Sequence, residues 1–320
     1  MSGDLYSLGL GPTDGRGLGV PGTAGAAGPR LADAAFVDVH YHADPDAYRR
    51  RHSAVAAGRR YAEHGGWVVL KNHLGCTAAQ AREAREQGQP VSGSTVLNSP
   101  AGGLDPQVVL GSYYRHGDGG GARLIVHLPT VTGRPHTSRL ARDPGHPHLA
   151  AHPMPPLTVS EEDGRLRPVV LEILRMAKDL DLVVSTGHAS GDEVRRLVDA
   201  AVELELPALM LNQPASPMTG LRYRDLAELA LAPMVYTEQT ALTYLLGYQS
   251  EEDFRQVLTL LPRTVYSSDL GQPSQPDVAD WLALSASWFA RFGLDPQRVR
   301  EITRDTPAQL LGLGKENSDV

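Results

Sequence analysis

The sequence predicts a (β/α)8 barrel, or TIM barrel, built as one catalytic domain. Eight short aliphatic runs along the 320 residues each end in a polar or metal-liganding side chain. In such a barrel all strands finish at the rim that carries the active site, so polar residues recur at strand ends. The predicted strands cover residues 36–42, 67–73, 90–98, 122–130, 182–188, 208–213, 234–239 and 264–269.

Helical patterns separate these runs, and no two predicted strands follow each other as a hairpin would require. Most strand starts lie 23 to 32 residues apart, which leaves room for a strand, a helix and two loops. Ser190 and Glu193 form a capping-box pattern that places a helix start just after His188. The predicted helices cover residues 77–88, 165–180, 191–205, 250–260, 276–292 and 296–312.

The barrel is expected to span residues 36–314, with a flexible Gly/Pro-rich arm at 1–35 and a tail at 315–320. A G-x-G-x-x-G match at 17–22 lacks the strand and helix of a dinucleotide site. The interval between strands four and five is longer than the others. Its extra residues, 131–160, predict a lid insertion, and a solvated surface loop is the alternative.

Composition narrows the class of protein. A net charge of −7 and a pI near 5.9 argue against nucleic acid as a partner. No apolar run approaches the roughly 20 residues of a membrane helix. The single cysteine, Cys76, excludes an internal disulfide and a cysteine-ligated cluster. We therefore expect a cytoplasmic enzyme without a membrane partner, and the pattern allows a homo-oligomer.

The first strand ends in His40-x-His42. Side chains alternate faces along a strand, so these two imidazoles should point the same way and bind one ion. Asp38 has the same parity, and we expect it to face inward, deeper in the barrel, where it orients ligands. Other strand ends complete the set. The expected metal ligands are His40, His42, His73, His188, Glu238 and Asp269.

Six candidate ligands predict two ions, because one catalytic ion uses three or four protein ligands. Imidazoles mixed with carboxylates suit iron, manganese or zinc. Arg49, Arg50 and Arg51 could reach an anionic substrate, but we interpret them as a solvated helix face. Three more polar residues lie near the same strand ends and are the expected catalytic residues: Lys71, His127 and Asn212.

Several strings resemble the amidohydrolase-like TIM-barrel metalloenzymes, namely DVHYH (38–42), GH (187–188), SSD (267–269) and DTPAQLLGL (305–313). A closer resemblance covers nearly all of residues 36–313. It is to a bacterial barrel family that includes the non-heme diiron monooxygenase of platensimycin and platencin biosynthesis. The strings that carry it are HYHADPDAYRRR (40–51), VLKNH (69–73), TVLNSPAGGLDP (95–106), LPTV (128–131), STGH (185–188) and SSDLGQP (267–273).

This resemblance implies an O2-dependent monooxygenase with two iron ions that hydroxylates a hydrophobic acyl-CoA, expected to be a diterpenoid. The chain carries no flavin motif or cluster ligands, so a separate electron donor or reductase would supply the electrons. Arginine binds phosphate oxygens bidentately, and the insertion is rich in it. The expected substrate-binding residues are Arg134, Arg139 and Arg142.

Two departures keep alternatives open. Amidohydrolases usually carry a bridging carboxylated lysine or a glutamate on strand four and a histidine on strand six, where this chain has His127 and Asn212. Lys71 lies on strand two instead. The alternative function is a binuclear metal-dependent hydrolase or lactonase in which Asp269 is the general base. A third reading is a binding protein on a barrel that has lost its activity.

Overall fold

The structure is a computed structural model that describes residues 28–314. Residues 1–27 and 315–320 lie outside the described residues. The expectations for the predicted tail, for the G-x-G-x-x-G match at 17–22 and for most of the predicted arm therefore fall outside the described part of the chain.

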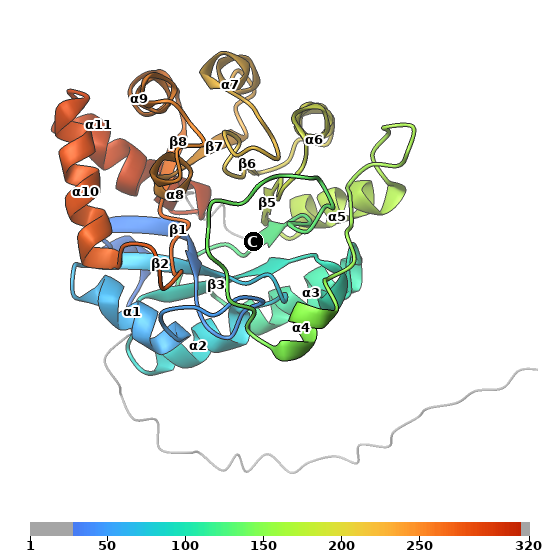
Figure 1. The fold of residues 1–320 in the computed structure, drawn as a ribbon, viewed down its shortest axis with the longest axis horizontal. Helices are drawn as coiled ribbons and strands as arrows, with labels where there is room; N and C mark the ends of the chain where they lie inside the picture. The colour runs from blue at the N-terminus through green and yellow to red at the C-terminus, as the bar shows by residue number, and fades with distance from the viewer. Residues whose placement is uncertain (1–27, 315–320) are drawn as a thin grey trace, which may run out of the picture.

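The predicted barrel is confirmed. Eight parallel strands pair in chain order and form a ring with helices outside it (Figure 1). The end of the last strand meets the first strand, because the backbone N–H of Asp269 donates to the carbonyl of His40 at 2.9 Å. The strands are β1 Phe36–His42, β2 Gly66–Lys71, β3 Val91–Val96, β4 Ile125–His127, β5 Val183–Ser185, β6 Leu209–Leu211, β7 Val235–Thr240 and β8 Thr264–Ser267.

All six predicted helices are confirmed, with bounds within three residues of the prediction except where the last is divided. A π-helical turn, Glu301–Asp305, divides it into α11 and α12. The helices are α1 Ala54–Ala62, α2 Ala78–Glu86, α3 Pro106–His116, α4 Pro147–Ala151, α5 Pro168–Asp179, α6 Gly191–Glu203, α7 Tyr223–Leu229, α8 Ala241–Leu245, α9 Glu251–Leu260, α10 Val278–Arg291, α11 Pro296–Arg300 and α12 Thr306–Leu310.

The predicted capping box at the start of α6 is also confirmed. The Ser190 side chain accepts from the N–H of Glu193, and the Glu193 carboxylate accepts from the N–H of Ser190. The predictions did not include α1, α3, α4, α7 or α8. A glycine weakens the helical pattern of α1, yet packing requires it, because a Cβ at Gly58 would lie 2.5 Å from the Val91 side chain.

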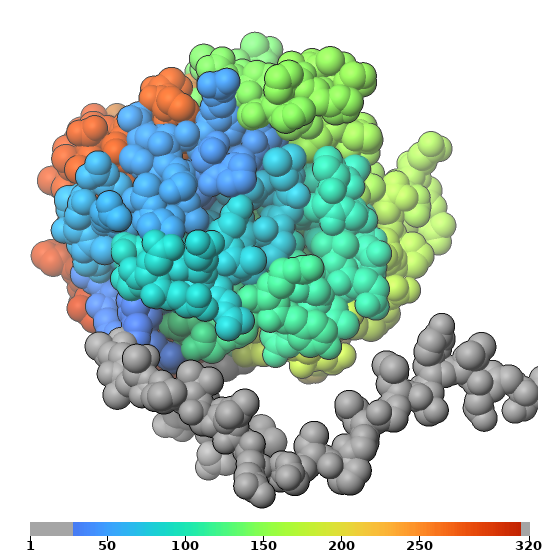
Figure 2. Space-filling model, turned by 90° about the horizontal axis from the view of Figure 1, so that it is seen from below, coloured from blue at the N-terminus to red at the C-terminus, as the bar shows by residue number. Residues whose placement is uncertain are grey.

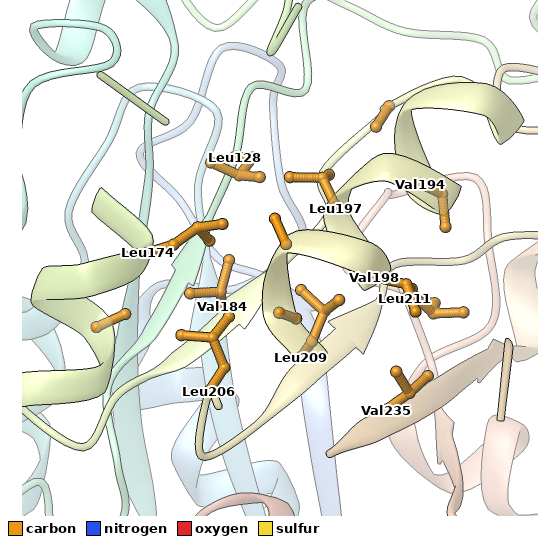
Figure 3. Packing of buried hydrophobic residues seen from close by; sticks show 14 of the residues in the cluster. Leu128, Leu174, Val184, Val194, Leu197, Val198, Leu206, Leu209, Leu211 and Val235 are labelled. Atoms are coloured by element: carbon orange, nitrogen blue, oxygen red, sulfur yellow. The ribbon is translucent and has the colours of Figure 1, made fainter. Parts of the chain in front are cut away.

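Two apolar layers stabilise the barrel. Outside the strands, Val184 and Leu209 pack against Leu174 of α5 and Leu197 of α6 (Figure 3). A second layer fills the interior at the end opposite the site. Leu31, which lies in the predicted arm, belongs to this layer, and its N–H donates to the carbonyl of Gly120 at 3.1 Å. The described part of the arm therefore closes the lower end of the barrel.

The insertion at 131–160 contains one short helix, α4, and crosses the rim of the barrel (Figure 1). It forms the green surface at the upper end of the molecule in Figure 2. Arg139 fixes its middle by donating to the carbonyls of Leu246 and Gly247 at 2.7 and 3.0 Å. No helix within residues 28–314 combines the length and apolar character needed to cross a membrane.

Candidate metal centre

A β-bulge in β1 decides which of its side chains reach the site. The register against β2 shifts between Asp38 and Tyr41, so the alternation of faces is interrupted there. Val39 packs in the interior apolar layer, whereas Asp38 accepts a hydrogen bond from Tyr61 of α1 at 2.5 Å. The prediction that Asp38 faces inward was therefore wrong. It still orients the strand end, because it accepts the N–H of His40 at 3.0 Å.

Three side chains from opposite ends of the chain converge at the rim. The Nε2 atoms of His40 and His42 lie 3.4 Å apart. Oδ1 of Asp269 lies 3.0 Å from Nε2 of His40 and 3.3 Å from Nε2 of His42. All three residues are buried, and their ligand atoms are close enough to share one metal ion. We call this group the His40–His42–Asp269 triplet.

Two other carboxylates hold the opposite side of each imidazole. Nδ1 of His40 lies 2.8 Å from Oε1 of Glu238, and Nδ1 of His42 lies 3.1 Å from Oδ2 of Asp46. A carboxylate that accepts a hydrogen bond from the Nδ1–H group leaves the Nε2 lone pair free to bind a metal. Asp46 was not among the residues predicted from the sequence. Its spacing of four residues after His42, in a loop, is a weak signal.

The triplet passes a simple test of fit for a cation. With both Nδ1 protons directed at carboxylates, two imidazole lone pairs and one carboxylate oxygen face each other in a buried space. Burial lowers the pKa of His40, but Asp269 and Glu238 raise it to about 9, so a proton is strongly attracted to this position. Burial raises the pKa of Asp269, yet His40 holds it well below its usual range. A divalent cation satisfies the same three acceptors.

The backbone at the rim takes unusual conformations to present these groups. Asp269 has φ of 54°, a left-handed conformation that is uncommon for a residue other than glycine. Gly187, just before His188, has φ of 58°, and a Cβ there would overlap the carbonyl oxygen of Leu128. Only glycine fits at position 187. This close contact between the segments that follow β4 and β5 fixes the position of His188.

His73 and His188 line the pocket above the triplet from two different walls. Nδ1 of His73 lies 2.9 Å from Oγ1 of Thr130, and its ring stacks on His42 with centroids 4.8 Å apart. The Gln213 amide donates to Nε2 of His188 at 3.3 Å. Burial holds the pKa of both histidines well below the usual value, so both imidazoles are neutral.

The three predicted catalytic residues form one polar group inside the barrel. Nζ of Lys71 donates to Oδ1 of Asn212 at 3.0 Å. Ser185 donates to the same oxygen at 3.4 Å and lies 2.8 Å from Nδ1 of His127. Burial lowers the pKa of Lys71, although Glu238 and Asp269 oppose that effect. Lys71, His127 and Asn212 do not line the pocket. They lie deeper in the barrel, below the pocket.

The arginines divide into three roles. Arg50 is buried and pairs with Asp46 at 2.6 Å, so its interpretation as part of a solvated helix face was wrong. Arg134 donates to the carbonyl of His188 at 3.0 Å and pairs with Glu193 at 2.5 Å. Arg139 donates to the carbonyls of Leu246 and Gly247 and does not itself line the pocket. Arg142 lines the pocket and is exposed. Of the three predicted substrate arginines, Arg142 lines this pocket, and both Arg134 and Arg142 line an adjoining pocket beside His73 and His188.

Comparison with solved structures supports the fold. A dihydroorotase is 15% identical, with a TM-score of 0.51 over 89% of this chain and 70% of that one. A mutant organophosphorus hydrolase from Deinococcus radiodurans is 16% identical, with a TM-score of 0.51 over 91% and 99%. The 2,6-dihydroxybenzoate decarboxylase from Rhizobium is 12% identical, with a TM-score of 0.50 over 87% and 98%.

These likenesses confirm the amidohydrolase-like TIM-barrel fold. They do not support the predicted relation to the diiron monooxygenase of platensimycin and platencin biosynthesis. No curated protein matches the sequence. The model of a family of unknown function, DUF6282, matches residues 35–238, and the chain belongs to that family.

Proposed function

We propose that this protein is a metal-dependent hydrolase of the amidohydrolase type that acts on an ester, lactone or amide of a small molecule. One observation carries the proposal: the His40–His42–Asp269 triplet, with both Nδ1 atoms held by carboxylates. Zinc, manganese and iron all suit this donor set. The likeness to a dihydroorotase and an organophosphorus hydrolase of the same fold agrees with this class of reaction.

In this proposal His40, His42 and Asp269 hold the divalent cation. Such a cation would lower the pKa of water towards neutrality and polarise a substrate carbonyl. Asp269 is placed to accept the proton from water, because its carboxylate lines the pocket beside both imidazoles. The roles of Glu238 and Asp46 are to fix the imidazole rings. This assigns Glu238 a positioning role in place of the predicted metal-ligand role.

The pocket indicates what substrate would fit. Leu140, Met218 and Leu242 give it apolar walls, whereas Arg142 and His136 stand near its mouth. Twelve of the 17 residues that line the pocket are polar or charged, so it suits a substrate that makes polar as well as apolar contacts. The exposed guanidinium of Arg142 suits a carboxylate or phosphate on that substrate. We therefore propose a substrate that carries an acidic group at one end.

The test is hydrolysis of a panel of aryl esters and lactones by protein reconstituted with zinc or manganese. We expect turnover that a chelator removes, that metal restores and that survives strict exclusion of oxygen. The predicted diiron monooxygenase requires the opposite: oxygen uptake that depends on substrate and on an electron donor, with two irons per chain. Oxygen uptake without any hydrolysis would reject the hydrolase.

A further inference from the structure

A second group of residues looks like a place for a second ion: His42, Asp46 and His73. The carboxylate of Asp46 is already fully used. Its Oδ2 atom accepts from Nε and Nη2 of Arg50 at 2.8 and 2.6 Å, and its Oδ1 atom accepts the N–H groups of Ala47 and His73 at 2.7 Å each. A buried guanidinium at this distance would repel a cation, so this group is unsuited to metal.

The opposite wall offers too few ligands for a second ion. Nε2 of His127 and Nδ1 of His188 are buried and bond no other residue in the described part of the chain. Neither atom belongs to a group of three ligand atoms among residues 28–314. A bridging carboxylate is also missing, because Glu238 already accepts from Ser267 and Gln213 as well as contacting His40. One metal ion normally needs three or four protein ligands.

Lys71 lies in the barrel interior and is 1% exposed. Its Nζ atom crosses from β2 to β6, where it bonds Asn212. The chain has only three lysines among its 30 lysine and arginine residues. Of the two within residues 28–314, Lys71 is buried and Lys178 is exposed. Glu238 and Asp269 are the carboxylates that interact with it most strongly.

The buried charges around the triplet disfavour a second ion. Asp46 and Arg50 cancel, Glu238 and Asp269 contribute −2, and the Lys71 ammonium contributes +1. With His40 neutral, as a metal-bound imidazole is, one divalent ion brings the buried site to +1, whereas a second would bring it to +3. Uncompensated buried charge is costly.

We propose that the site binds one divalent cation, at the His40–His42–Asp269 triplet, and that the ammonium group of Lys71 stands in place of a second ion. This rests on the proposed metal-dependent function and replaces the two ions expected from the number of candidate ligands. Lys71 thereby becomes a positioning residue that sets how many ions the site accepts.

The experiment is a calorimetric titration of metal-depleted full-length protein with zinc, checked by elemental analysis of the loaded protein. It is done in a His152→Ala background, because the exposed rings of His148 and His152 stack at 4.1 Å and could bind zinc themselves. We expect one ion per chain, with no change when bicarbonate is added. Two ions per chain, or a second ion that appears with bicarbonate, would overturn the proposal.

Lys71→Met tests the role of the ammonium group directly, with the exposed Lys178→Met as the matched control. Loss of a nearby positive charge should tighten the single zinc site, on the order of tenfold, whereas Lys178→Met should leave it unchanged. Weaker or unchanged zinc binding in Lys71→Met would contradict the proposal. If that variant does not fold, the number of zinc ions bound by the protein that retains Lys71 still tests the proposal.

The same data separate this inference from the hydrolase. One ion per chain without any ester or lactone hydrolysis would support the inference and count against the proposed function. Two ions with metal-dependent hydrolysis would do the reverse. Failure of zinc to bind at all would reject both.

Discussion

Nδ1 of His40 lies 2.8 Å from Oε1 of Glu238, and both side chains are fully buried. This contact joins β1 to β7 and fixes the direction in which the opposite nitrogen, Nε2, points. Glu238 is itself fixed by Ser267, which donates to the same oxygen at 2.8 Å. The carboxylate therefore acts on the metal position through the imidazole.

Glu238→Gln should weaken metal binding without abolishing it. The amide can accept through one oxygen but no longer carries the charge that strengthens the Nδ1 contact, and losses of this kind reduce metal affinity about 10- to 100-fold. Calorimetry should show the same number of ions with a higher Kd. Asp46→Asn should behave alike, because Asp46 holds His42 in the same way. Complete loss of the ion in Glu238→Gln would make Glu238 a metal ligand, as the sequence predicts.

Asp269→Asn should remove the ion. Oδ1 of Asp269 is the one carboxylate oxygen in the triplet, and a neutral amide both binds metal less well and cannot accept a proton from water. Elemental analysis should find less than about a tenth of the wild-type metal content, and hydrolysis should fall at least ~100-fold. The exposed Asp280→Asn in α10 is the control and should keep both. Full metal content in Asp269→Asn would place the ion elsewhere.

Arg142→Ala should impair substrate binding, whereas Arg139→Ala should not. Arg142 faces the pocket, and loss of a charged contact to an acidic substrate typically costs about 1.5–3 kcal/mol, which is a rise in KM of roughly 10- to 100-fold. Arg139 bonds the carbonyls of Leu246 and Gly247, so its loss should lower the thermal midpoint instead. Steady-state kinetics with acidic and neutral esters decide the matter. Equal effects on both ester types would contradict an acid-binding role.

Glu193→Gln should make the protein less stable at neutral pH and less sensitive to acid. Burial raises the pKa of Glu193, but hydrogen bonds from Ser160 and Ser190 and the nearby Arg134 hold it below its usual range. A carboxyl with a lowered pKa in the folded state contributes stability above its ordinary pKa of 4.5, and that stability is lost as the pH falls through the folded value.

Thermal unfolding at several pH values measures this effect. The loss in Glu193→Gln should be about 1–3 kcal/mol at pH 7 and should shrink at low pH. The exposed Glu203→Gln near the end of the same helix should follow the wild type. A constant difference between Glu193→Gln and the wild type at every pH would mean that the charge of Glu193 does not matter.

Local patterns in the sequence were enough to predict the barrel and much of its rim. Apolar runs, their polar ends and a capping box are local patterns, because strand burial and helix capping depend on residues close in the chain. These patterns were enough to single out His40, His42 and Asp269 as candidate ligands. The start of α6 followed from Ser190 and Glu193 in the same way.

The contacts that those side chains make depend on how the whole chain folds. The bulge in β1 turns Asp38 away from the interior. The sequence prediction assumed that side chains alternate faces along the whole strand, and a bulge interrupts that alternation. Asp46 and Arg50 lie in a loop without a periodic pattern, yet burial pairs them beside His42. Glu238 stands next to His40 although 198 residues separate them. Closing the barrel brings distant groups within 3 Å, and at that distance charge and hydrogen bonding decide which groups are free to bind a ligand.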